Sequence, residues 1–215
     1  MTGRERTGRI VAGLIAALGA ASLYIQALAI VEIGAGRGLG PIVSLWSMLG
    51  YFTILTNMAI VVVMAAIALE RWPRWWPGPR GLLASLTACI LLVGAVYHLL
   101  LRNLWNPVGL YWWADQGLHT AMPLLTFAFW LVFAPKAGLR YAHVPRWLLF
   151  PVAYAVYVQA RGALEGWYPY PFSDAKALGL GKVILNSAGI GVFFVLASLA
   201  IVALAKGLAP RSPPS

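Results

Sequence analysis

Long uncharged runs constrain this chain more than any other feature of its sequence. Residues 10–31 form 22 consecutive positions without Asp, Glu, Lys or Arg. About 20 apolar residues are enough for a helix to cross the hydrocarbon core of a bilayer. Because lipid offers the backbone no hydrogen-bond partners, we expect this run to be helical. It is also longer than the apolar region of a signal peptide, so we expect a retained first membrane helix.

Five further apolar segments predict an all-α, polytopic membrane bundle of six transmembrane helices. They cover residues 42–69, 82–101, 116–134, 147–160 and 183–205. The second span is 28 residues long, which predicts tilt or an interfacial first turn. The fifth is short, and we expect it to continue past Arg161, whose long side chain can reach the interface. One domain is expected over residues 1–206, with a disordered tail over 207–215.

The basic residues divide unequally between the two ends of these spans. Only 10% of the residues are charged, against about 25% in soluble domains, so each charge carries topological information. Eleven Lys and Arg fall on the side of the N-terminus and five on the other side. The positive-inside rule then places both termini in the cytoplasm. We expect a multi-pass protein of the cell membrane, here the bacterial inner membrane, and no nucleic-acid partner despite the net charge of +10.

Two polar stretches interrupt the apolar spans. In the first, Thr53, Thr56 and Asn57 stand at i, i+3 and i+4, which places them on one helix face. In the second, Asp115 precedes His119 by four residues, so the carboxylate can bond a ring nitrogen and fix the tautomer. Pro123 lacks an N–H, so we expect a kink there and a His119 carbonyl in need of another donor.

The expected topology places these groups and other polar side chains in the outer half of the membrane. Polar residues within spans normally face the interior of a bundle, so we expect an outward-facing polar pocket. Taken singly, each residue has an ordinary structural explanation, such as a threonine hydroxyl bonded to its own i−4 carbonyl. The supporting residues expected at the pocket are Asn57, Tyr97, His98, Arg102, Asp115, Arg161 and Asn186.

Three segments together resemble a known family. They are Tyr-Phe-Thr-Ile-Leu-Thr-Asn at 51–57, the stretch from Leu118-His119 to Pro123, and Gly-Trp-Tyr-Pro-Tyr-Pro-Phe at 166–172. In motif order and span number, nearly the whole chain resembles a bacterial family of six-span membrane proteins. That family is similar to the androgen-induced-protein family, which hydrolyses fatty acid esters of hydroxy fatty acids with a threonine and a histidine. The last of the three segments is not a feature of the eukaryotic branch.

The resemblance implies Thr53 as nucleophile and His119 as base, with Thr56 as the alternative nucleophile. A threonine hydroxyl needs an adjacent base, and His119 would take its proton and return it to the leaving alcohol. Asp115 or a backbone carbonyl would orient the imidazole. Asn57, Tyr97 or Arg102 would donate to the developing oxyanion. The substrate would be a membrane lipid ester, with no metal or cofactor.

Two other functions compete with this lipid esterase. His98 and His119 on facing helices are also the pattern of axial haem ligands. A transporter or a non-catalytic lipid-binding protein could use the same pocket without chemistry. The sequence leaves the acyl chain, the alcohol part and the oligomeric state open. Cys89 is the only cysteine, so no intrachain disulfide forms.

Overall fold

The computed structural model describes residues 2–71, 79–104 and 106–209, and all regular elements in these ranges are helical. This confirms the all-α expectation. The α-helices are α1 (Gly3–Ala35), α2 (Pro41–Met48), α3 (Phe52–Ala68), α4 (Pro79–Val96), α5 (Leu110–Gln116), α6 (Met122–Phe133), α7 (Val144–Trp147), α8 (Leu149–Glu165), α9 (Ala175–Leu178) and α10 (Leu180–Leu208). Two π-helical turns, η1 (Tyr97–Leu101) and η2 (Gly117–Ala121), and two 3-10 turns, η3 (Tyr141–His143) and η4 (Pro171–Ser173), complete them.

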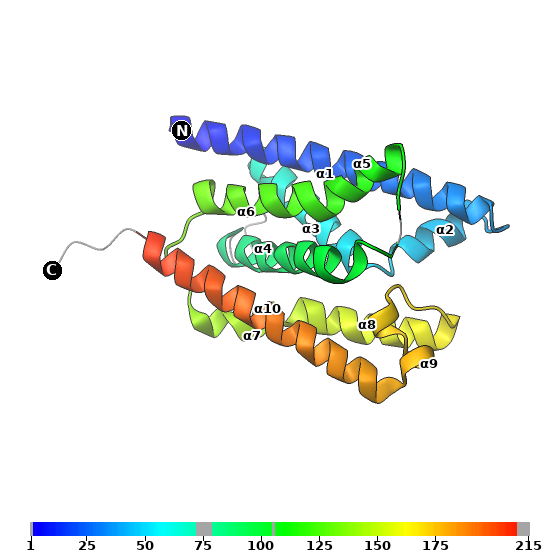
Figure 1. Cartoon of the computed structure of the whole chain (residues 1–215). Helices are drawn as coiled ribbons and strands as arrows, with labels where there is room; N and C mark the ends of the chain where they lie inside the picture. The colour runs from blue at the N-terminus through cyan, green and yellow to red at the C-terminus, as the bar shows by residue number, and fades with distance from the viewer. Residues whose placement is uncertain (1, 72–78, 105, 210–215) are drawn as a thin grey trace.

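The long helices run lengthwise beside one another, and α1 packs against α3 while α4 packs against α6 and α10 (Figure 1). Four stretches of the described chain are long and apolar enough to cross a membrane: α1, α4 with η1, α5 with η2 and α6, and α10. The bent pair α2 and α3 makes a fifth if it is one span. These helices mark a multi-pass membrane protein. The start of α1 and the end of α10 lie at the same end of the molecule (Figure 1).

The second predicted span is not a single tilted helix, because it breaks at residues 49–51. The axes of α2 and α3 differ by 83° across this break. A helix end leaves backbone carbonyls without partners, and two tyrosines of α8 supply donors here. The Tyr154 hydroxyl donates to the Gly50 carbonyl at 2.9 Å, and the Tyr157 hydroxyl donates to the Leu49 carbonyl at 3.4 Å. The break therefore has its own set of tertiary contacts.

The loop between α8 and α9 folds back over this break. Gly166 ends α8 in the left-handed conformation, with φ at 76°, a region that glycine enters without a steric penalty. Tyr51 then makes edge-on ring contacts with both Trp167 and Tyr170, each with a centroid separation of 5.7 Å. On the far side of the loop, the Asn186 amide donates to the Phe172 carbonyl at 3.0 Å. The loop is thus a fixed part of the bundle.

Helix α10 is the last helix among the described residues. Helix α10 continues through Gly207 to Leu208, so the first residues of the expected tail are helical. Residues 210–215 lie outside the described residues, as do residues 72–78 and Trp105 of two expected boundary loops.

Candidate functional site

Two π-helical turns carry the polar side chains at the centre of the site. In η1, the Arg102 amide donates to the Tyr97 carbonyl at 2.8 Å, five residues back. Tyr97 and His98 therefore lie on a widened helical turn, and His119 and Thr120 lie on a second one, η2. Such π turns rotate side chains away from the regular helical pattern and occur frequently at functional sites.

Pro123 accounts for the turn η2. The Met122 amide donates to the Gly117 carbonyl, five residues back, so the Leu118 carbonyl loses its α-helical partner. The residue five positions after Leu118 is Pro123, which has no N–H to give. Instead, the Asn57 amide of α3 donates to the Leu118 carbonyl at 3.3 Å, as well as to the Thr53 carbonyl at 2.8 Å. The interhelical donor thus reaches Leu118, one residue before the carbonyl that the sequence analysis singled out.

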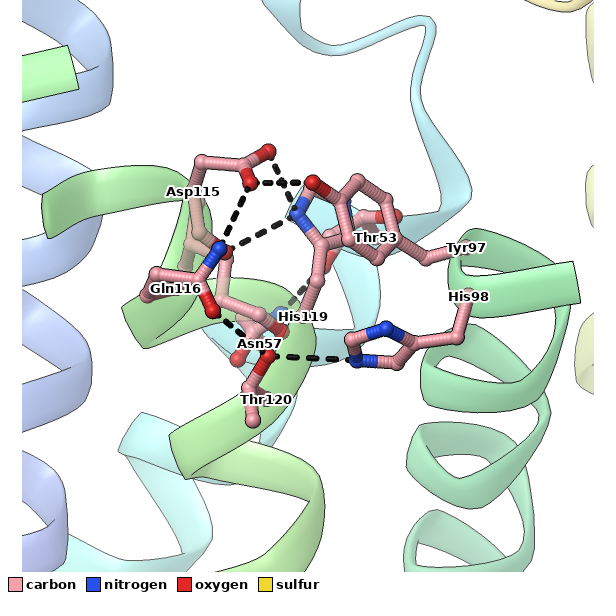
Figure 2. Close-up of polar contacts among 9 residues, drawn as sticks. Thr53, Asn57, Tyr97, His98, Asp115, Gln116, His119 and Thr120 are labelled. Carbon is pink, nitrogen blue, oxygen red and sulfur yellow. Dashed lines mark hydrogen bonds and ion pairs between the residues drawn. The ribbon is translucent and has the colours of Figure 1, made fainter. Parts of the chain in front are cut away.

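Asp115 is the centre of the polar network in Figure 2, and its side chain is fully buried. The Tyr97 hydroxyl donates to Oδ2 of the Asp115 carboxylate, and the Gln116 amide approaches the same oxygen at 3.4 Å. Nδ1 of His119 hydrogen-bonds the Asp115 backbone carbonyl at 3.1 Å. The other carboxylate oxygen of Asp115, Oδ1, also lies 3.1 Å from Nδ1 of His119. This contact is within ion-pair distance but does not have the geometry of a hydrogen bond. A buried carboxylate is costly unless it is hydrogen-bonded; here Oδ2 accepts from Tyr97 and Gln116, whereas Oδ1 has no hydrogen-bond donor among the described residues.

The His119 ring is fixed in position and in tautomer. It stacks on the Tyr97 ring with a centroid separation of 4.0 Å and an interplanar angle of 12°. A carbonyl oxygen only accepts hydrogen bonds, so the bond to the Asp115 carbonyl requires the proton on Nδ1. The neutral ring then carries its lone pair on Nε2, which no group of the described residues hydrogen-bonds. His119 is therefore arranged as a proton acceptor.

Two cavities meet at Thr53, the second residue of α3. One has a volume of about 350 Å3, and its walls include Thr53, Tyr97, His119 and Tyr170. The other has a volume of about 440 Å3 and also contacts Thr53 and Tyr170, but its remaining walls are mostly apolar side chains of α4, α8 and α10. We call them the His119 cavity and the apolar cavity. Among the described serine and threonine residues, Thr53 alone borders both cavities, and its hydroxyl is therefore the aliphatic hydroxyl best placed to meet a bound molecule.

Tyr170 of the folded-back loop completes this junction. Burial raises the pKa of Tyr170 to about 12, although its hydrogen bonding with Thr53 acts in the opposite direction. The phenol therefore stays protonated near neutral pH and can donate. From the sequence, residues 166–172 contribute only to the family resemblance, because a loop has no periodicity that shows which of its side chains points inward.

Most other predicted site residues lie outside the walls of the two cavities. Thr56 is fully buried, and its hydroxyl has no hydrogen-bond partner among the described residues. Asn57 is equally buried and uses its amide on Thr53 and Leu118, as described above. Arg102 is exposed and borders neither cavity. Asn186 holds the loop at Phe172 instead.

His98 lies on the outer surface of the same network. Its Nε2 pairs with the Thr120 hydroxyl at 3.2 Å, and that hydroxyl donates to the side-chain amide oxygen Oε1 of Gln116 at 3.1 Å. The ring of Tyr97 contacts the rings of both His98 and His119. The two histidines are thus joined through one tyrosine and a hydrogen-bonded chain (Figure 2).

Arg161 has partners inside the protein. The side chain is 6% exposed. Its Nε lies 2.9 Å from both carboxylate oxygens of Glu165, and one terminal nitrogen donates to the Tyr157 hydroxyl at 3.0 Å. The guanidinium also lies 4.4 Å from the centre of the Trp46 ring. Arg161 therefore supports the break between α2 and α3 from the α8 side.

Comparison with family models, with curated proteins and with solved structures finds no match to this chain.

Proposed function

We propose that this chain is an intramembrane lipid esterase in which Thr53 is the nucleophile and His119 the general base. One observation carries the proposal: Thr53 and His119 border the same cavity, while Asp115 holds the imidazole so that its lone pair is on Nε2. A nucleophile, a base and a group that orients the base are the parts that acyl transfer requires. The same pair is implied by the resemblance to the androgen-induced-protein family.

The reaction would proceed in two steps. In the first, the Thr53 oxygen attacks the ester carbonyl while His119 takes the hydroxyl proton, and the alcohol leaves with that proton. In the second, His119 activates a water molecule that releases the acyl chain from Thr53. The site lies within a largely apolar bundle, where electrostatic stabilisation of the transition state is stronger than in water.

Tyr170 is the donor that fits the developing oxyanion. Its side chain, like that of Thr53, borders both cavities. Of the three donors expected from the sequence, Tyr97 already donates to Asp115, and Asn57 donates to two backbone carbonyls. The third, Arg102, borders neither cavity.

The proposed enzyme crosses the bacterial inner membrane six times, with both termini in the cytoplasm. Helices α7 and α8 are separated only by Leu148, whose backbone is itself helical, and residues 144–165 would span about 33 Å at 1.5 Å per residue. That length matches the hydrocarbon core of a bilayer and supports α8 as an additional crossing. The basic-residue distribution supports the orientation, which places Thr53 and His119 toward the outer leaflet.

A lipid-binding protein or transporter without chemistry is the second candidate. The observation that favours it is the apolar cavity of about 440 Å3, which His119 does not border. A cavity of this kind holds an alkyl chain whether or not a bond is broken.

Hydrolysis by the purified protein in detergent separates the two candidates. Substrates would be p-nitrophenyl esters and branched esters of hydroxy fatty acids, with a fluorophosphonate probe to label the nucleophile. We expect Thr53→Ala and His119→Ala each to lower the rate about 100-fold or more, and Thr53→Ala to abolish labelling. Thr56→Ala should stay close to wild type. A folded wild-type protein that neither turns over nor labels would refute the esterase and favour lipid binding.

A further inference from the structure

The His119 cavity has an arginine at its outer end. Gln26, Ile30 and Ile33 of α1 border the cavity at helical spacing, and Arg37 follows in the turn after α1. Exposure increases in the same direction along the walls, from 7% at Thr53 to 38% at Ile33, and Arg37 is exposed. The cavity therefore runs from the buried reacting groups to an opening at which Arg37 lies.

No acidic side chain neutralises Arg37. All six Asp and Glu residues of the chain lie within the described ranges, and the ion pairs they form there involve Arg9, His119 and Arg161. The other walls of the cavity are apolar side chains, uncharged polar side chains and the imidazole of His119. An unpaired guanidinium beside an apolar chamber presents several donors to a planar anion, and can bind it through two parallel hydrogen bonds.

We propose that Arg37 binds the anionic group of an amphiphile whose chain lies in the His119 cavity. Resting on the proposed function, this makes Arg37 the residue that selects esters with a negative charge. The shared chemistry is an oxyanion that accepts two hydrogen bonds, whether a carboxylate or a lipid phosphate.

The proposal also assigns the two halves of the substrate. His119 returns its proton to the leaving alcohol, so the alcohol part lies on the His119 side of Thr53 and carries the charge. The acyl chain then lies in the apolar cavity, whose walls contain no charged residue.

Binding of 12-carbon probes tests Arg37 without requiring turnover. Native mass spectrometry of the full chain in detergent would measure competition among dodecanoate, dodecyl phosphate and uncharged methyl dodecanoate. Wild type should prefer an anionic probe over the ester by about tenfold, the effect of one charge-assisted pair. Arg37→Gln should remove that preference, and Arg37→Lys should retain only part of it, because an ammonium keeps the charge but not the two parallel hydrogen bonds. Lys182→Gln, which removes an exposed charge bordering neither cavity, should behave as wild type.

The outcomes separate this proposal from the esterase. If wild type prefers dodecanoate, the anionic group that Arg37 binds is a carboxylate, and if it prefers dodecyl phosphate, that group is a phosphate. In each case Arg37→Gln must abolish the preference. Wild type without an anion preference, or Arg37→Gln with the preference intact, overturns the role of Arg37. An Arg37-dependent preference in a protein that never hydrolyses an ester would leave Arg37 as an anion-binding residue and refute only the catalysis.

Discussion

Tyr97 fixes two neighbouring side chains of the site at once. Its hydroxyl donates to the buried carboxylate of Asp115, and its ring stacks on His119 at 4.0 Å. Tyr97→Phe separates these roles because it keeps the ring and removes the donor. We expect ester hydrolysis to fall about tenfold, since a hydrogen bond to a charged group contributes about 1.5–3 kcal/mol. Labelling of Thr53 should persist.

Tyr24→Phe is the matched control for this substitution. Tyr24 is 65% exposed on α1 and borders neither cavity, so its hydroxyl should be dispensable. An unchanged rate in Tyr97→Phe would show that Asp115 does not need this donor to position the imidazole.

At the residue scale, part of the site follows from the sequence. The i, i+4 spacing predicted the contact between Asp115 and His119, because helix geometry alone brings these positions together. Tyr170 and Arg37 could not be found in this way. Both lie in connecting segments, where the backbone path depends on tertiary contacts such as those of Tyr51 with the loop.

At the element scale, the turn η2 depends on an amide from another helix. Asn57→Leu keeps a side chain of similar size but leaves the Leu118 carbonyl without its donor. An unpartnered buried carbonyl costs about 1–3 kcal/mol, so we expect thermal unfolding in detergent at a lower temperature than wild type.

Thr56→Val is the control one position earlier on α3. The Thr56 hydroxyl is buried without a partner among the described residues, so replacing it with a methyl group should leave stability unchanged or raise it. Equal decreases in the unfolding temperature of Asn57→Leu and Thr56→Val would mean that any substitution at this depth disturbs packing. The hydrogen bond to the Leu118 carbonyl would then not be the source of the loss.

The break between α2 and α3 shows why element boundaries inside membrane segments are difficult to predict. Residues 42–69 contain no charged residue and no proline, so composition indicates one continuous span. Gly50 is the only local signal, since glycine lowers helix stability. Tyr154 and Tyr157, which donate to the freed carbonyls, lie about 100 residues away in sequence. Nothing in the sequence around them shows that they bond to this break.

At the scale of the whole molecule, the proposed topology makes a prediction about which residues face the cell exterior. Cys89 is the only cysteine and is buried, so Cys89→Ala gives a background for single-cysteine labelling. On intact cells, a membrane-impermeant maleimide should label Lys182→Cys but neither Thr2→Cys nor Leu208→Cys. All three positions are exposed, so permeabilised cells should label all of them.

Six crossings return the chain to the side of the membrane on which it started. Labelling of only one terminal position in intact cells would therefore require an odd number of crossings. Labelling of both terminal positions but not of Lys182→Cys would agree with an even number of crossings and would mean that both termini face the cell exterior. Thr53 and His119 would then lie toward the inner leaflet.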